Sequence, residues 1–250
     1  SWAGDDRLVF SIARDRLYAW GLYAMSVSDR RRIVTLNTHD LVRVLGTPLA
    51  RPDNLLVWIE KSAQNNGRPG GVLELDLRRN ALSDAGESDH NFRSAIPLPP
   101  NTDGVLRWFL DREGEVRYAV THRDGATGIS RRDAGDAWTP ITLDLLRNSP
   151  LGVDKDSSVL IVAHLAPDGS RELRRYDTRN GSFDPALHTD DKYDFSHGSV
   201  IFSAGAREII GLVYARQATK QVWFTPEDNE LQAALDASLP ANHLNRICLL

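Results

Sequence analysis

Apolar residues fall in short runs of four to eight along the whole chain. The runs are rich in Val, Ile, Leu, Trp and Tyr, and residues such as Gly, Asp, Asn and Pro separate them. Short apolar runs bounded by turn residues are typical of β-strands joined by tight turns. A sustained helical period is almost absent from the chain, so we expect few helices.

Five of these runs share one form, in which a turn residue precedes a buried strand and a more exposed strand follows. They are residues 7–12, 54–59, 104–110, 158–163 and 199–203. Their first apolar residues lie 47, 50, 54 and 41 positions apart. Four-stranded propeller blades repeat at about 40 to 50 residues. The period predicts an all-β fold, a β-propeller of about five four-stranded antiparallel blades in one domain, residues 1–250, with approximate blades 5–45, 46–95, 96–148, 149–197 and 198–250.

A two-sheet β-sandwich is the competing all-β fold. Its strands usually follow one another at about 8 to 12 residues without a longer period. A single four-stranded sheet cannot bury both of its faces, so blades stack around an axis and each covers the next. The long period therefore favours the propeller.

A second pattern recurs between these runs. Residues 73–80 and 173–181 are alternating strands that end at Asp76 and Asp177 and continue into a polar turn, and residues 130–135 form a weaker copy. An Asp side chain can accept hydrogen bonds from backbone N–H groups two residues later and so cap the turn. We expect this pattern to mark the third strand of a blade and its hairpin to the outer strand.

One segment, residues 226–240, departs from the strand pattern. Its apolar residues are 231, 234, 235 and 239, which is helical spacing. Asp228 or Asn229 is the candidate N-cap, and Pro240 would end the helix. We expect a short helix near 228–238, outside the blades, that packs under a blade edge rather than binding a partner.

Bulk composition narrows the class of protein. The chain has 250 residues, 41% hydrophobic and 26% charged, as in ordinary globular domains, which excludes wholesale disorder. The net charge is −4 with both signs interspersed, so we expect no nucleic-acid partner. No apolar stretch approaches the roughly 20 residues that span a bilayer, so we expect no membrane partner. The single cysteine, Cys248, excludes an internal disulfide but leaves the compartment open between cytoplasm and periplasm or secretion.

Candidate chemistry is sparse. A serine hydrolase of the α/β type needs Gly-x-Ser-x-Gly, which is absent, and the nearest serines, Ser199 and Ser203, are better explained as strand and turn residues. The seven histidines are scattered and none forms His-Glu-x-x-His, so we expect no metal site and no cofactor. Residues 154–158 open like a calcium loop but lack its Gly and its bidentate Glu. We therefore expect no catalytic residue, and the sequence assigns no substrate-binding residue.

The stretch 190–197 is denser in polar chemistry than its surroundings. It could lie at the mouth of the propeller and face a substrate. The alternative is an interblade loop whose Asp and Ser residues cap turns, and we favour this alternative because such residues commonly do so.

Several strings give the chain a resemblance to a known family. They are residues 2–9, 110–117, 172–177, 209–214, 222–224, 231–236 and 245–247. No single string is diagnostic, but their order, with a helix just before the next blade, is more specific. Together they resemble the N-terminal propeller of bacterial serine peptidases of the prolyl oligopeptidase family, in its acylaminoacyl-peptidase and dipeptidyl-peptidase-like branch.

The resemblance implies a role outside catalysis. In that family the propeller sits over a C-terminal α/β-hydrolase domain and restricts which peptides reach its serine. The implied partners are that domain and peptide substrates, and this chain as given would not be an enzyme. Family rings usually close with seven or eight blades, so about five blades could leave an open edge that self-associates. A free-standing propeller that binds proteins or ligands is the alternative function.

Overall fold

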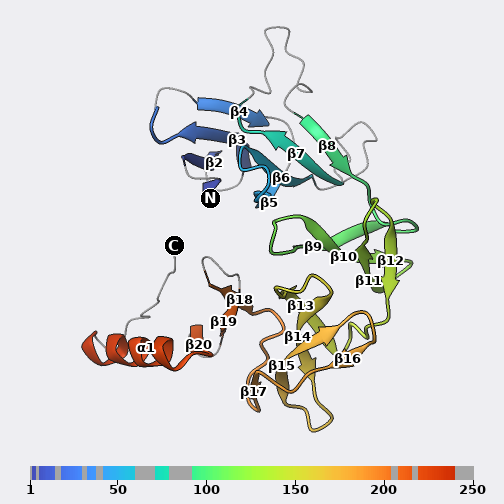
Figure 1. The fold of residues 1–250 in the computed structure, drawn as a ribbon, viewed down its shortest axis with the longest axis vertical. Helices are drawn as coiled ribbons and strands as arrows, with labels where there is room; N and C mark the ends of the chain where they lie inside the picture. The colour runs from blue at the N-terminus through green and yellow to red at the C-terminus, as the bar shows by residue number, and fades with distance from the viewer. Residues whose placement is uncertain are drawn as a thin grey trace. The chain divides into compact units, whose positions relative to one another are not determined.

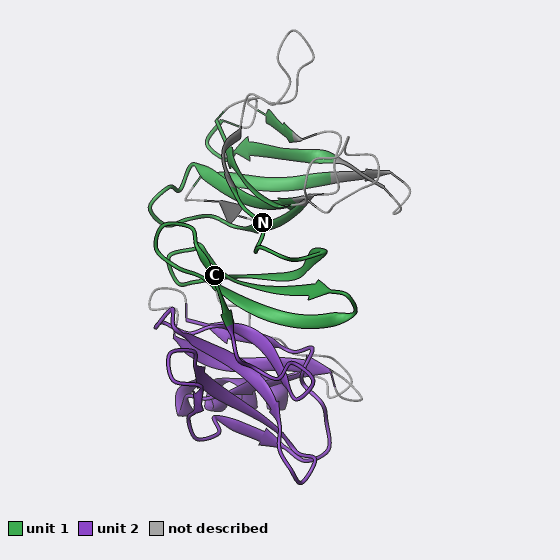
Figure 2. Ribbon diagram, turned by 90° about the vertical axis from the view of Figure 1, so that its right-hand side faces the viewer, with its two compact units in different colours: residues 1–140 green, residues 141–250 purple. Residues whose placement is uncertain are grey.

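The computed structural model describes residues 2–3, 6–14, 18–29, 33–37, 42–59, 71–78, 92–203, 208–215 and 219–239. These residues form twenty strands and one helix (Figure 1). The chain divides into two compact units, residues 1–140 and residues 141–250 (Figure 2).

The first unit contains three four-stranded antiparallel sheets whose strands pair in chain order. The first sheet consists of β1 (Trp2–Ala3), β2 (Arg7–Arg14), β3 (Tyr18–Ser26) and β4 (Ile33–Asn37). The second consists of β5 (Val42–Gly46), β6 (Asn54–Ile59), β7 (Gly71–Asp76) and β8 (Phe92–Ile96). The third consists of β9 (Gly104–Leu110), β10 (Val116–Arg123), β11 (Ala126–Arg132) and β12 (Trp138–Ile141).

The second unit contains two antiparallel sheets and the helix. The fourth sheet consists of β13 (Asn148–Val153), β14 (Val159–Leu165) and β15 (Arg171–Asp177), and both β16 (Ser182–Phe183) and β17 (His188–Asp190) pair with β15. The fifth sheet consists of β18 (Ser199–Phe202), β19 (Ile209–Ala215) and β20 (Thr219–Trp223), followed by α1 (Pro226–Ser238). All pairs are antiparallel, and every strand except β17 pairs with its neighbour along the chain, as in propeller blades.

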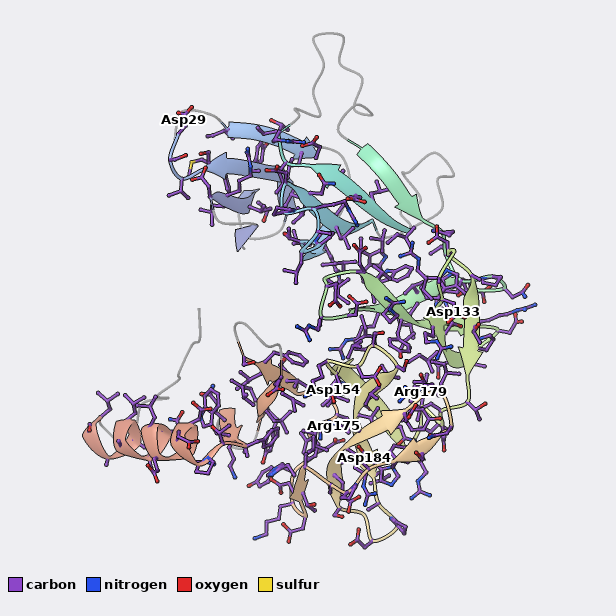
Figure 3. The ribbon with its side chains drawn as sticks, viewed as in Figure 1. Asp29, Asp133, Asp154, Arg175, Arg179 and Asp184 are labelled. Atoms are coloured by element: carbon purple, nitrogen blue, oxygen red, sulfur yellow. The ribbon has the colours of Figure 1, made fainter. Side chains whose placement is uncertain are left out.

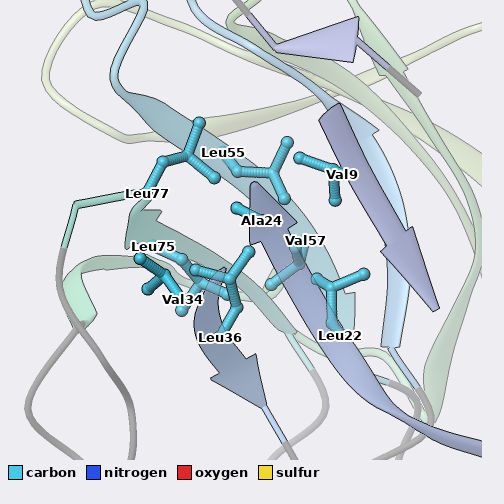
Figure 4. Close-up of a cluster of buried hydrophobic side chains, with 9 residues drawn as sticks. All are labelled: Val9, Leu22, Ala24, Val34, Leu36, Leu55, Val57, Leu75 and Leu77. Atoms are coloured by element: carbon cyan, nitrogen blue, oxygen red, sulfur yellow. The ribbon is translucent and has the colours of Figure 1, made fainter. Parts of the chain in front are cut away.

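Within each unit, consecutive sheets bury each other's faces, and the second sheet shows this most clearly. One buried cluster joins side chains of the first sheet to Leu55 and Val57 of β6 (Figure 4). The intervening residue, Leu56, points to the other face and joins a cluster with Trp108 and Val116 of the third sheet. Side chains alternate across a strand, so one strand packs on two neighbours. A two-sheet sandwich does not cover both faces of one sheet in this way.

The strand pairing shows that the five apolar runs do not all occupy the same position in their sheets. Residues 7–12, 54–59 and 158–163 lie in second strands, β2, β6 and β14, as one repeat position requires. The runs at 104–110 and 199–203 lie instead in first strands, β9 and β18, and the second strands of those sheets are β10 and β19. First and second strands both contribute side chains to buried clusters, as Trp108 of β9 and Leu56 of β6 do, so composition alone does not separate them.

The polar-turn pattern does mark third strands. Residues 73–80, 173–181 and 130–135 include the ends of β7, β15 and β11. The Oδ1 atom of Asp76 accepts the N–H of Arg78 at 2.9 Å, and that of Asp177 accepts the N–H of Arg179 at 2.9 Å. Each Asp therefore caps its turn as the sequence predicts.

The helix is present, but its N-cap is Thr225 rather than Asp228 or Asn229. The Thr225 hydroxyl accepts the N–H of Asp228 at 3.3 Å, and the Asp228 carboxylate accepts the Thr225 hydroxyl in return. Pro226 follows the cap at the first helical position, where a missing N–H costs nothing. The helix begins earlier than expected because the proline starts it. Pro240 lies outside the described residues.

Candidate functional site

The polar stretch 190–197 joins β17 of the fourth sheet to β18 of the fifth. Asp190, the last residue of β17, is 5% exposed, and its carboxylate is fully engaged. Its Oδ1 accepts the N–H groups of Lys192 and Tyr193 at 3.0 and 3.1 Å. Its Oδ2 accepts the hydroxyl of Tyr214 on β19 at 2.7 Å. Asp190 therefore ties the start of the loop to the neighbouring sheet.

Aromatic side chains surround this hydrogen bond. Phe195 is fully buried, and its ring lies 5.5 Å from the Tyr214 ring and 5.8 Å from the His188 ring, measured between centroids. The His188 Nε2 atom lies 3.4 Å from the Tyr214 hydroxyl. We call Asp190, Tyr214, His188 and Phe195 the β17–β19 cluster. The cluster is an apolar core that contains one buried carboxylate, that of Asp190, and hydrogen bonds satisfy both of its oxygens. Buried polar groups are tolerated in this way.

The second half of the loop is held by Asp194. Its Oδ1 accepts the N–H of Ser196 at 2.8 Å and faces the Arg171 guanidinium at 3.0 Å. Partial burial raises the pKa of Asp194, but the Ser196 hydrogen bonds and the Arg171 charge outweigh it and hold the pKa below its usual value. The Asp and Ser residues of the loop thus cap its turns, which is the interblade-loop alternative favoured by the sequence.

The two candidate serines lie at the start and just after the end of β18. Ser199 is exposed at the start of β18. Ser203 closes the turn between β18 and β19: its hydroxyl accepts the N–H of Glu208 at 3.1 Å, and its own N–H binds the Glu208 carbonyl at 2.8 Å. Both occupy the strand and turn positions that the sequence indicated.

The described histidines lie on different strands or in a loop. His122 is on β10, His164 on β14, His188 on β17, and His197 in the following loop. Positions 39, 90 and 243, and Cys248, lie outside the described residues. Across the described ranges, no group of three or more His, Cys, Asp or Glu side chains could hold a metal ion.

The calcium-like turn uses its carboxylates locally. Asp154 is buried, and its Oδ2 binds the Arg175 Nε atom at 2.6 Å (Figure 3) while its Oδ1 accepts the N–H of Lys155. Asp156 accepts the N–H of Ser158 at 2.9 Å. These bonds close the turn between β13 and β14, so the carboxylate oxygens of Asp154 and Asp156 have a structural role.

The fourth sheet carries a group of charged residues around His164 that sequence reasoning missed. The His164 Nδ1 atom lies 2.8 Å from the Asn148 side-chain oxygen. Burial lowers the pKa of His164, and the positive charges of Arg174, Arg147 and Arg171 lower it further against the opposing charge of Glu172. The adjacent Arg174 and Glu172 are paired at 2.6 Å. Cross-strand pairing brings these residues together, and no local motif signals it.

Comparisons with known proteins address the fold. No family model and no curated protein matches this chain. Among solved structures, TolB from Acinetobacter baumannii superposes with a TM-score of 0.51 at 17% identity, over 88% of this chain and 50% of that one. The chain is a β-propeller. It spans half the length of that TolB. No helix that the structure describes is long and apolar enough to cross a membrane.

Two further likenesses are more distant. A solved structure described as a TolB, from Agrobacterium tumefaciens, superposes with a TM-score of 0.48 at 13% identity, over 78% of this propeller and 63% of that chain. Oligopeptidase B from Trypanosoma brucei gives a TM-score of 0.40 at 10% identity, over 77% of this propeller and 28% of that chain. The neighbours thus include TolB-like propellers and propeller-containing peptidases.

Proposed function

We propose that this chain is the non-catalytic propeller portion of a serine peptidase of the prolyl oligopeptidase family. Its role is to screen peptide substrates for a C-terminal α/β-hydrolase domain and to support that domain. The observation that carries the proposal is the order of the resembling strings along the chain. They extend from residues 2–9 at the start to residues 245–247 near the end.

The strings that the structure describes fall in strands, in one turn and in the helix, and they are spread over both units. Residues 2–9 cover β1 and the start of β2, and residues 110–117 cover the turn between β9 and β10. Residues 172–177 lie in β15, residues 209–214 in β19, and residues 231–236 in α1 directly after the fifth sheet. A shared architecture alone does not carry function, so the proposal rests on this order.

The local chemistry agrees with a supporting role. In the described residues, the polar groups of the 190–197 loop and of the β13–β14 turn are engaged in caps and ion pairs that hold the blades. Catalytic groups, in contrast, need a nucleophile and a base within hydrogen-bonding reach of each other. We therefore place the chemistry in a domain outside this chain.

The test begins with the reading frame that contains these residues. A Gly-x-Ser-x-Gly motif downstream, followed by an Asp and a His, is expected. The whole polypeptide should then cleave chromogenic aminoacyl or dipeptidyl substrates, and its Ser→Ala variant should not. The isolated chain should be inert in the same assay. Serine-dependent turnover by the isolated chain would refute the proposal.

A second assay separates screening from simple support. The hydrolase domain without the propeller should accept long peptides that the whole polypeptide excludes, while short substrates are cleaved by both. A stop codon soon after position 250 would instead favour the alternative, a free-standing propeller that binds a protein or a ligand.

A further inference from the structure

Polar side chains cap the first turn of helix α1 and attach the helix to the fifth sheet. The Thr225 hydroxyl accepts the Asp228 N–H and donates to the Asp228 carboxylate, which caps the first turn. The Asn229 amide donates to the Trp223 carbonyl at 2.9 Å, and the Trp223 indole N–H donates to the Gln232 side chain at 3.3 Å. Residues three apart lie on one face of a helix, so the face containing Asn229 and Gln232 is turned toward β20.

The apolar residues of α1 lie on a different face. Leu231 and half-buried Leu235 lie one turn apart with Ala234 beside them, and Leu239, the extended C-cap residue, follows the helix directly; we call these residues the apolar stripe. Leu231 is 51% exposed and Leu239 is 44% exposed. Within the described residues, no side chain of α1 is buried. The helix thus meets β20, the outer strand of the fifth sheet, through the polar residues Asn229 and Gln232, and it leaves Leu231 exposed.

Charge determines what can cover this stripe. The helix carries Glu227, Asp228, Glu230 and Asp236 and no basic residue. Glu227 lies one turn before Leu231, and Glu230 one turn before Ala234, so acids flank the stripe. A second α1 would bring like charges together at short range, which is unfavourable. An apolar surface with a basic rim, in contrast, satisfies both the leucines and the acids.

We propose that Leu231 and Leu235 of α1, with the C-cap residue Leu239, form a docking surface for an amphipathic partner helix that presents apolar side chains flanked by Lys or Arg. This interaction does not depend on the peptidase role proposed above. It is the packing of two amphipathic helices along an apolar seam, in which Leu231 and Leu235 act as anchors.

The probe is a synthetic amphipathic helix of about 18 residues, long enough to be helical in water, with leucines on one face and lysines beside them. A matched peptide has glutamates in place of the lysines. Binding is followed by fluorescence anisotropy of the labelled peptide at low and high salt. The lysine peptide should bind the chain, more weakly as salt rises, and the glutamate peptide should not.

Variants locate the site. Leu231→Glu and Leu235→Glu should each weaken binding of the lysine peptide about tenfold or more, as removal of a central apolar anchor does. Glu230→Lys should also weaken it, by removing a complementary charge. The matched control is Leu146→Glu, because Leu146 is exposed but lies outside the helix. Circular dichroism confirms that each variant keeps its structure.

Equal binding of both peptides, or binding unaffected by Leu231→Glu, overturns the proposal. So does a dimer in analytical ultracentrifugation that Leu231→Glu dissociates, since the occupant would then be a second copy. These outcomes do not depend on whether the peptidase proposal holds or fails.

Discussion

Glu74 and Arg175 occupy the same position in their sheets and carry opposite charges. Each lies in a third strand, two residues before the Asp that caps the following turn, Asp76 or Asp177. Each pairs with the turn between the first and second strands of its own sheet. Arg51 binds Glu74 at 2.5 Å, and Asp154 binds Arg175 at 2.6 Å. The two sheets thus share an ion pair at this position, but the acid and the arginine have exchanged places.

The inversion indicates that the geometry of the blade, rather than one charge pattern, selects this pair. In both cases the carboxylate is the more buried partner, at 10% exposure for Glu74 and 8% for Asp154. A buried carboxylate without a partner is costly. The arginines, which lie closer to solvent, therefore satisfy the acids from opposite sides of the hairpin.

Arg175→Met should destabilise the second unit by about 2 kcal/mol, because it leaves the Asp154 carboxylate buried without its cation. The matched control is Lys155→Met, whose ion pair with Glu208 is exposed on both sides and should contribute less than about 0.5 kcal/mol. Urea unfolding measures both. Equal losses in the two variants would contradict the assignment.

His164 should titrate below its ordinary pKa of 6.5. A depressed pKa means that the folded state favours neutral histidine, so its contribution to stability is present above pH 6.5 and is lost as pH falls through the folded pKa. Arg174→Gln should raise this pKa and Glu172→Gln should lower it, because the two charges act in opposite directions. NMR titration of the ring proton checks the signs. Shifts in one direction for both variants would refute the electrostatic explanation.

Tyr214→Phe should cost about 1 to 3 kcal/mol, because the buried Asp190 loses a hydrogen-bond donor while its charge stays inside. Tyr23→Phe is the control. Tyr23 stacks on Phe10, and its hydroxyl makes no hydrogen bond within the described part of the chain. Its loss should change stability by less than about 0.5 kcal/mol. If the two variants are equally stable, Asp190 does not depend on Tyr214.

Gly114→Ala and Gly125→Ala separate steric from backbone effects. Both glycines have positive φ, 76° and 78°. A Cβ atom at Gly114 would lie 2.5 Å from the Thr47 carbonyl oxygen, whereas one at Gly125 meets nothing within 4 Å. Gly125→Ala should cost about 1 kcal/mol for the left-handed backbone alone. Gly114→Ala should cost at least about 2 kcal/mol more, and equal losses in thermal unfolding would contradict this.

Association through strand edges stays a prediction. Within the described residues, β20 is the outer strand of a three-stranded sheet. Exposed edges pair with other chains unless they are covered or charged. Light scattering should show mass rising with concentration, and Thr219→Lys should reduce the rise. A monomer at every concentration would argue against an open edge.

The polar-turn pattern was a better guide to strand position than the apolar runs were. An Asp that caps a turn acts on atoms two residues away, so its role can be recognised in a short string such as 76–78 or 177–179. An apolar run such as 104–110 does not reveal whether it forms a first or a second strand, because both kinds contribute side chains to buried clusters. Only the pairing of β9 with β10 distinguishes them.

The sequence by itself determined the all-β class, the propeller period, the third-strand turns and the presence of α1, since these depend on local propensity and spacing. Tertiary structure alone decided the contacts of Tyr214 with Asp190, of Arg175 with Asp154, and of the polar face of α1 with β20. The physical reason is separation along the chain: these partners meet only when strands pair and sheets stack, and no short-range signal encodes which distant side chain will be opposite.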